Sequence, residues 1–263
     1  MMELRDVTKT YDQGRRTVQA VRGVSLRIVG GEFVSIMGPS GSGKSTVLHL
    51  LGALDTPSSG AALFDGRDLR AMSDRERSHL RRTRIGFIFQ FFNLLPTLKG
   101  GENVALPLLL AGKSRGEARK LAEASLERVG LSDRIDHFPE EMSGGEMQRV
   151  AIARALVTNP EAVLCDEPTG NLDSVTSEEI LTLLRGLPES GRCAVVMVTH
   201  DAYSASYADR IVHIRDGRIE SEVRKHNIGA RGQESGIKDQ ESRETVQDTG
   251  IAPSRAASVR PDA

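Results

Sequence analysis

Tryptophan is absent from this sequence, and cysteine is scarce. The 263 residues include two cysteines, Cys165 and Cys193, and neither belongs to a Cys-x-x-Cys pair. The sequence therefore has neither the ligand spacing of a zinc site nor the cysteine framework of a small disulfide-stabilised domain. Such sparing use of cysteine is typical of a reducing compartment.

The sequence also lacks an excess of charge of one sign. Its 35 lysines and arginines are balanced by 36 acidic residues, which leaves a net charge of -1. Proteins that bind nucleic acid usually present a strongly basic surface, so nucleic acid is not expected as a partner.

Long apolar runs are missing as well. The most apolar stretch, residues 104–111, is much shorter than the roughly 20 residues of a transmembrane helix, and it contains Pro107. The first residues, MMELRDVTKTYD, have no apolar segment of the kind found in signal peptides, and either Met1 or Met2 could be the start. We therefore expect a cytoplasmic protein that is held at a membrane only through a partner.

What the sequence does contain is an alternation of strand and helix patterns. Residues 24–28 alternate apolar and polar side chains, and residues 33–37 form an apolar run typical of a buried strand. Two apolar stripes have helical spacing; they are Val47, Leu50, Leu51, Leu54 and, before Gly130, Ala118, Leu121, Ala122, Ser125, Val129. Further strands are expected at 61–64, 85–89, 162–165, 194–199 and 211–214, and a helix at 173–187. This order predicts an α/β fold with a mostly parallel sheet covered by helices.

The pattern divides the chain into three parts. Strands and helices alternate in residues 2–89 and 160–222, whereas residues 90–159 have mainly helical patterns. The remaining part, 225–263, has no Phe, Tyr or Trp and is rich in polar and charged residues, so we expect a disordered tail.

A glycine-rich loop follows the strand expected at 33–37 and precedes a helix. It reads Gly38, Pro39, Ser40, Gly41, Ser42, Gly43, Lys44, Ser45, Thr46. Strand, loop and helix in this order are the context that a phosphate-binding loop requires. Glycines let backbone N–H groups converge on phosphate oxygens, and the helix N-terminus adds partial positive charge. We expect Lys44 to reach the β and γ phosphates of a nucleotide and the Ser45 hydroxyl to bind Mg²⁺.

Two adjacent carboxylates follow another apolar strand. Asp166 and Glu167 come directly after the run AVLC, at the strand end where open α/β sheets bind their ligands. Next to a phosphate-binding loop, this pair predicts that Asp166 binds Mg²⁺ and that Glu167 polarises the attacking water.

A second glycine turn lies at residues 142–157, which read MSGGEMQRVAIARALV. Ser143 and Glu146 have the spacing of a capping box, which accounts for a helix start on its own. Gly144 and Gly145 are poor helix formers, however, and their presence also fits a backbone that approaches an anion closely.

The run SGGEMQRVAIARAL resembles the signature motif of ABC ATPases, and other motifs of that family occur in the same order. Gln90 ends an apolar strand as the Q-loop glutamine does, and Asn171-Leu172-Asp173 after DEPTG resembles the D-loop. His200 ends the strand VVMVTH as the switch histidine does, and Tyr11 has the place of the adenine-stacking aromatic. The resemblance covers residues 2–222 and contains one nucleotide module.

The resemblance implies a P-loop NTPase fold, with a RecA-like core, an N-terminal antiparallel β-subdomain and a helical signature subdomain. It implies an ATP hydrolase with ATP and Mg²⁺ as its cofactors. Lys44, Glu167 and His200 would be catalytic, and Ser45, Gln90 and Asp166 would hold the metal. Tyr11 and Gln90 would join the glycine-rich loop in binding nucleotide. Ser143, Gly144, Gly145 and Glu146 would contact ATP on a second subunit, with Asp173 in the D-loop.

The resemblance also implies partners. Residues 86–112 and the run DEPTGNLDS are similar to the lipoprotein-releasing and macrolide-export group, whose ATPase subunits form a dimer on an integral membrane permease. Members of this group transmit force to a domain outside the cell. An ABC ATPase that drives a permease-like partner in cell division or envelope signalling remains an alternative.

Three surface features bear on such a partner. The apolar run 91–95 would help line the permease groove, or Phe91 and Leu95 would simply be core. Residues 99–101, Lys-Gly-Gly, are expected to loosen the permease-facing loop. The arginines of residues 75–84 could face the permease or anionic lipid, but a solvated helix face is the better explanation of them.

Overall fold

The computed structural model describes residues 1–14, 16–188 and 193–225 and contains two sheets. The tail expected from residue 225 onward lies outside the described residues from 226 on. The smaller sheet is antiparallel and has the order β2 (Arg16–Ile28), β1 (Met2–Gln13), β4 (Ser59–Phe64), β5 (Arg67–Asp68).

The larger sheet has six strands and a mostly parallel arrangement. Its order is β10 (Arg218–Arg224), β9 (Arg210–Arg215), β3 (Phe33–Met37), β8 (Ala194–Thr199), β7 (Ala162–Asp166), β6 (Ile85–Phe89). All neighbours pair in parallel except β10, which is antiparallel to β9. The α/β class predicted from the sequence is therefore confirmed.

Helices cover this larger sheet on both faces. The α-helices are α1 (Lys44–Leu51), α2 (Asp74–Thr83), α3 (Gly100–Leu110), α4 (Arg115–Arg128), α5 (Gly144–Leu156), α6 (Ser174–Gly186) and α7 (Ala202–Ala205). Short 3-10 turns occur at Leu69–Ala71, Ser132–Arg134 and Pro139–Glu141. In the described part of the chain, no helix has the length and apolar character needed to cross a bilayer.

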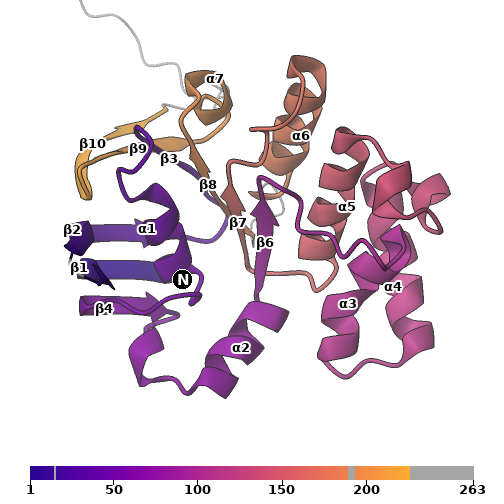
Figure 1. Cartoon of the computed structure of the whole chain (residues 1–263), viewed down its shortest axis with the longest axis horizontal. Helices are drawn as coiled ribbons and strands as arrows, with labels where there is room; N and C mark the ends of the chain where they lie inside the picture. The colour runs from indigo at the N-terminus through magenta and orange to yellow at the C-terminus, as the bar shows by residue number, and fades with distance from the viewer. Residues whose placement is uncertain (15, 189–192, 226–263) are drawn as a thin grey trace, which may run out of the picture. The chain divides into compact units, whose positions relative to one another are not determined.

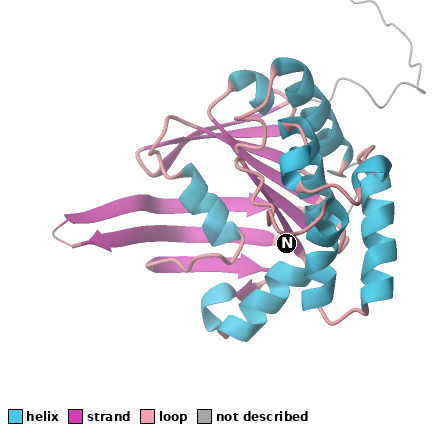
Figure 2. Cartoon of the chain, turned by 45° about the vertical axis from the view of Figure 1, so that its right-hand side comes forward, coloured by secondary structure: helices cyan, strands magenta, loops and turns pink. Residues whose placement is uncertain are grey.

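Strand periodicity explains how one sheet supports two cores. Successive side chains of a strand point to opposite faces. In β8, Val196 and Val198 pack in one core with α1 and the antiparallel sheet, whereas Val195 and Met197 pack in the other with α3, α4 and α5. Figure 1 shows the same division, with β1, β2, β4 and α1 on one side and α3–α5 on the other. Figure 2 shows the antiparallel strands extending away from these helices.

Two apolar residues and one loop differ from the sequence-based expectations. Leu54 and Leu121 were assigned to buried helical stripes, yet Leu54 lies beyond the end of α1 and both side chains are exposed. Residues 99–101 do not loosen a loop, because α3 begins at Gly100. A Cβ on Gly100 would lie 2.8 Å from the Arg134 carbonyl oxygen, and one on Gly101 would lie 2.6 Å from Ile135 Cγ1. These glycines allow α3 to pack closely against the segment before α5.

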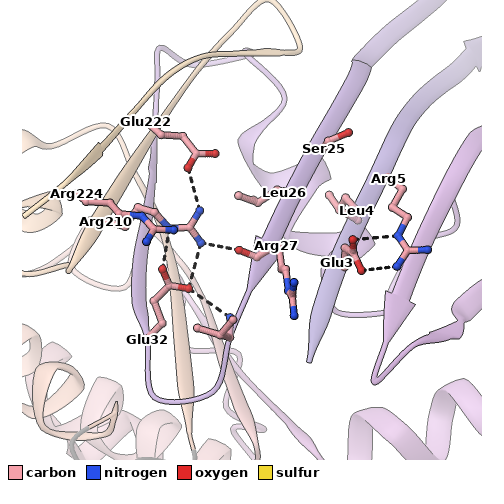
Figure 3. A pocket seen from close by; sticks show the side chains of 11 residues that line it. Glu3, Leu4, Arg5, Ser25, Leu26, Arg27, Glu32, Arg210, Glu222 and Arg224 are labelled. Carbon is pink, nitrogen blue, oxygen red and sulfur yellow. Dashed lines mark hydrogen bonds and ion pairs between the residues drawn. The ribbon is translucent and has the colours of Figure 1, made fainter.

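A buried arginine joins the two sheets at the start of β9. Arg210 is 5% exposed, and its guanidinium contacts the Glu32 carboxylate at 2.7 Å, Glu222 at 3.0 Å and the Arg27 carbonyl oxygen at 2.6 Å. Figure 3 shows these contacts in a hollow between β2 and β10, beside the exposed pair Arg5–Glu3. Arg210 thereby connects strand β2 of the antiparallel sheet to β9 and β10 of the other.

We expect Arg210→Ala to lower the free energy of unfolding by about 3 kcal/mol, because it removes a buried guanidinium and leaves the half-buried Glu32 carboxylate and the Arg27 carbonyl oxygen without this donor. Arg5→Ala removes the exposed pair with Glu3 and should change that free energy by less than about 1 kcal/mol. Urea denaturation of both variants measures the difference. Equal losses would show that Arg210 is no more than a surface ion pair.

Candidate functional site

The glycine-rich loop connects β3 to α1 and is held against neighbouring backbone. Gly43 precedes the first helical residue with φ of 98°, in the left-handed region that favours glycine. A Cβ on Gly43 would lie 2.3 Å from the Ala20 carbonyl oxygen, and one on Gly38 would lie 2.0 Å from that of Ile214. Lys44 folds back over the loop, where Nζ donates to the Pro39 carbonyl oxygen at 2.9 Å. The loop can therefore present N–H groups and one ammonium to an anion.

Sheet register brings the other expected polar residues to the same edge. Asp166, the last residue of β7, pairs with Phe89 of β6 and with Val198 of β8. Gln90 and His200 follow these two strands directly, so their backbones lie on either side of the Asp166 segment. The loop begins after β3, which pairs with β8, so all four segments meet at the carboxyl edge of the parallel strands.

Asp166 and Ser45 form a pair of oxygen donors at this edge. The Ser45 hydroxyl donates to Asp166 Oδ1 at 3.0 Å. Burial raises the pKa of Asp166, and the hydrogen bond from Ser45 acts in the opposite direction. A half-buried carboxylate beside a hydroxyl is a donor set that suits Mg²⁺, because hard cations prefer oxygen ligands.

Glu167 lies next to His200 and has an unusual backbone conformation. His200 Nδ1 is 3.1 Å from Glu167 Oε1, and the φ of Glu167 is 47°, a region that costs energy for a residue other than glycine. A hollow of about 300 Å³ lies beside both side chains. Both residues follow strands that end at the same edge of the sheet as the glycine-rich loop.

The turn at 143–146 forms the N-terminus of α5 and confirms the predicted capping box. The Glu146 amide donates to the Ser143 hydroxyl at 3.3 Å, and the Ser143 amide donates to the Glu146 carboxylate at 2.8 Å. That backbone bond and the guanidinium of Arg134 hold the pKa of Glu146 below its usual value. The Glu146 carboxylate thus has partners within its own chain, while the Ser143 side chain remains exposed.

Close packing at Gly145 joins this turn to the start of α6. A Cβ on Gly145 would lie 2.6 Å from Thr176 Cγ2. Asp173 caps α6, because its carboxylate accepts from the Thr176 amide at 3.0 Å and from the Thr176 hydroxyl at 2.7 Å. The Asn171 side chain donates to the Gln90 carbonyl oxygen at 3.0 Å. Residues 171–173 therefore lie between Gln90 and the 143–146 turn.

Tyr11 lies at the other end of the glycine-rich loop. Its hydroxyl donates to Asp55 at 2.8 Å, and Lys9 Nζ is 4.9 Å from the centroid of its ring. Burial and the Asp55 carboxylate raise the pKa of Tyr11, whereas an interaction with Thr46 lowers it. The structure thus places Tyr11 beside the loop, and its stacking on adenine stays a prediction.

Two polar residues of α5, the buried Gln148 and the half-buried Arg154, were not singled out from the sequence. Gln148 donates from Nε2 to the Pro168 carbonyl oxygen at 2.5 Å, just after Glu167. Arg154 donates to the carbonyl oxygens of Phe92 and Asn93 at 2.8 and 2.5 Å, just after Gln90. The available signal was a polar residue at an inward position, since Gln148 is one helical turn before the buried Ile152.

Comparison with known proteins agrees with this arrangement. The ABC transporter family matches residues 21–170. An uncharacterized ABC transporter ATP-binding protein of Thermotoga maritima is 52% identical over 86% of this chain and 96% of its own length. The macrolide export ATP-binding/permease protein MacB of Syntrophobacter fumaroxidans is 49% identical over 84% of this chain, which corresponds to 31% of MacB.

Solved structures show the same fold. A dimeric, post-hydrolysis structure of the ATP-binding cassette MJ0796, bound to ADP and Pi, has 46% identity and a TM-score of 0.80. The match covers 85% of this chain and 98% of that cassette. The chain therefore belongs to the ABC transporter family, in which it takes the place of the ATP-binding and ATP-hydrolysing subunit.

Proposed function

We propose that two copies of this chain hydrolyse Mg²⁺-bound ATP between them and thereby drive a membrane permease. The observation that carries this proposal is the meeting of Lys44, Ser45, Asp166, Glu167 and His200 at one edge of the parallel sheet. Phosphoryl transfer needs a cradle for the phosphates, a cation and a group that orients water, and these residue types supply all three.

Each residue has a separate part in the proposed reaction. Backbone N–H groups of the loop and Lys44 bind the β and γ phosphates, and Ser45, Asp166 and Gln90 hold Mg²⁺. When bound, Mg²⁺ neutralises negative charge on the phosphates. Glu167 accepts a proton as a water oxygen bonds to the γ phosphorus and the bond to the bridging oxygen breaks, which releases ADP and phosphate. His200, beside Glu167, contacts the γ phosphate.

We assign the 143–146 turn to the ATP of the second copy. The Ser143 side chain is exposed and lies at a helix N-terminus, where hydroxyl and N–H groups favour an anion. Gly144 and Gly145 keep the approach free of side chains. The dimeric structures of the similar cassette support this arrangement. Loss of the γ phosphate between the copies would loosen the dimer and couple hydrolysis to shape.

The proposed base is tested by Glu167→Gln. This variant keeps the shape of the side chain but cannot accept the proton, so we expect kcat to fall by about 100-fold or more. ATP should then hold the variant as a dimer in gel filtration. Glu127→Gln, on the exposed face of α4, should behave as the unmodified protein. Normal hydrolysis by Glu167→Gln would exclude Glu167 as the base.

The proposed contact across the dimer is tested by Ser143→Ala, with Ser73→Ala as its matched control. Both serines cap a helix in a capping box, so both variants should lose about 0.5–2 kcal/mol of stability. Only Ser143→Ala should impair ATP-dependent dimer formation and hydrolysis, and its binding of ATP as a monomer should be unchanged. Equal hydrolysis by the two variants would confine Ser143 to capping its own helix.

An apolar surface beside Gln90 fits the permease. Phe91 is 72% exposed and Leu110 is 58% exposed, so the alternative that Phe91 is core is wrong, and Leu95 is exposed as well. A groove of about 280 Å³ between α2, β6 and α3 is lined mainly by apolar side chains, including Phe89, Pro107 and Leu110. Of residues 91–95, which were expected to line such a groove, only Asn93 does so, and Phe91 and Leu95 lie outside it. Relatives named as combined ATP-binding and permease proteins support a permease as the occupant, with a cytoplasmic helix in this groove.

We extend the proposal to the subgroup of ABC transporters and to the location of the chain in the cell. The MacB relatives support a permease of the kind that transmits force across the membrane, with this chain on its cytoplasmic face. The chemistry at the site is common to the family and does not select a transported substrate.

Docking is tested by Phe91→Asp. A charge at this exposed position should abolish co-purification with the permease and leave the ATPase rate of the isolated subunit within about twofold. Val18→Asp places the same charge on an exposed valine of β2, in the β1–β2 hairpin, and this variant should still co-purify with the permease. Retention of the permease by both variants would remove Phe91 from the docking surface.

A further inference from the structure

Gln148 is a buried polar residue whose position is not explained by packing. It lies in the second turn of α5, is 0% exposed and is one helical turn before the buried Ile152. Its Nε2 donates to the Pro168 carbonyl oxygen at 2.5 Å. Its Oε1 is buried and, among the described residues, has no hydrogen-bond partner.

A side chain selected for stability alone would not have this pattern. A buried acceptor without a partner destabilises the folded state, and most buried polar groups in native proteins are paired. The one side-chain hydrogen bond that Gln148 makes is therefore the property to explain, and its acceptor is the carbonyl oxygen of Pro168, the residue after Glu167.

The backbone at Glu167 needs external support. Its φ of 47° is strained for a glutamate, and such strain persists only where surrounding contacts fix the chain. On one side the Glu167 amide donates to the Val198 carbonyl oxygen at 3.0 Å. On the other side, Gln148 holds the Pro168 carbonyl. The direction of the Glu167 carboxylate toward His200 thus depends on both β8 and α5.

The same helix carries the 143–146 turn. Gly145 is three residues before Gln148 and packs against Thr176, while Ser143 caps the helix. An α-helix is rigid over so short a distance, because each residue is fixed by backbone hydrogen bonds. A shift of the turn therefore moves Gln148, and through one hydrogen bond it moves Pro168, the residue after Glu167.

We propose that Gln148 is a positioning residue that ties the Glu167 carboxylate to the signature turn of the same chain. In a closed dimer, engagement of that turn with the ATP of the second copy would set the geometry of Glu167 at the first ATP. The two ATP sites would then communicate within each subunit through Gln148. This inference rests on the proposed roles of Glu167 and the 143–146 turn.

The test compares three substitutions of Gln148 that differ in their ability to donate a hydrogen bond to the Pro168 carbonyl oxygen. Gln148→Met has similar length and no donor, and Gln148→Glu has the same shape and no amide N–H. Gln148→His retains a ring N–H at comparable reach. We expect kcat to fall about 10- to 100-fold for Met and Glu, with KM for ATP within about twofold, because a small misplacement of a reacting group has effects of this size. The His variant should keep more of the activity than either.

A variant that changes only core packing separates an effect of the Gln148 hydrogen bond on kcat from an effect of lower protein stability. Ile152→Val, one turn further along α5 in the same core, should lower Tm while kcat stays unchanged. Rates are compared well below the Tm of each variant. If kcat follows Tm across all four variants, irrespective of the donor, Gln148 is only structural and the inference is overturned.

Dimer formation provides the second measurement and remains informative if kcat is altered by poor folding. In the Glu167→Gln background, adding Gln148→Met should leave the ATP-dependent dimer in gel filtration intact. Loss of that dimer would overturn the inference, because Gln148 would then act on closure. Should Glu167→Gln alone hydrolyse ATP normally, the proposed role of Glu167 as the base fails and the inference fails with it, whereas an unchanged kcat in Gln148→Met and Gln148→Glu overturns only the positioning role.

Discussion

Parallel pairing of β3, β8, β7 and β6 is the constraint on which the site depends. Because Asp166 pairs with both Phe89 and Val198, the residues that follow these strands emerge side by side. Four segments that are far apart in sequence thereby meet at one edge, and the glycine-rich loop occupies the end of this row. Without that register, the same side chains would be isolated polar residues at strand ends.

Among the helices, α5 contributes to several parts of the proposed site. Its N-terminus carries the Ser143 turn, and its buried face holds the peptide after Glu167 through Gln148. Further along, Arg154 holds the carbonyl oxygens of Phe92 and Asn93, which follow Gln90 and adjoin the apolar groove. A single helix thus carries the turn assigned to the second ATP, contacts the residue after the proposed base and contacts residues beside the proposed permease surface.

Buried polar groups have different roles in this protein. Arg210 is fully paired and joins two sheets, so its contribution is to the fold. Asp166 is half-buried with one hydroxyl partner, and burial raises its pKa, which is a condition that a bound cation would relieve. Gln148 is satisfied at one atom only.

The sequence by itself determined the strands, the loop and the helix starts, because these depend on local periodicity, glycine and capping residues. It predicted the glycine-rich loop between strand and helix and the Ser143 capping box, and the order of several motifs along the chain led to the family. The tertiary structure decided what local patterns do not encode. It exposed Leu54, Leu121 and Phe91, and it packed Gly100 against the segment before α5. It also directed Gln148 onto Pro168, because that contact joins residues far apart in the chain and arises only when α5 packs against the carboxyl end of β7.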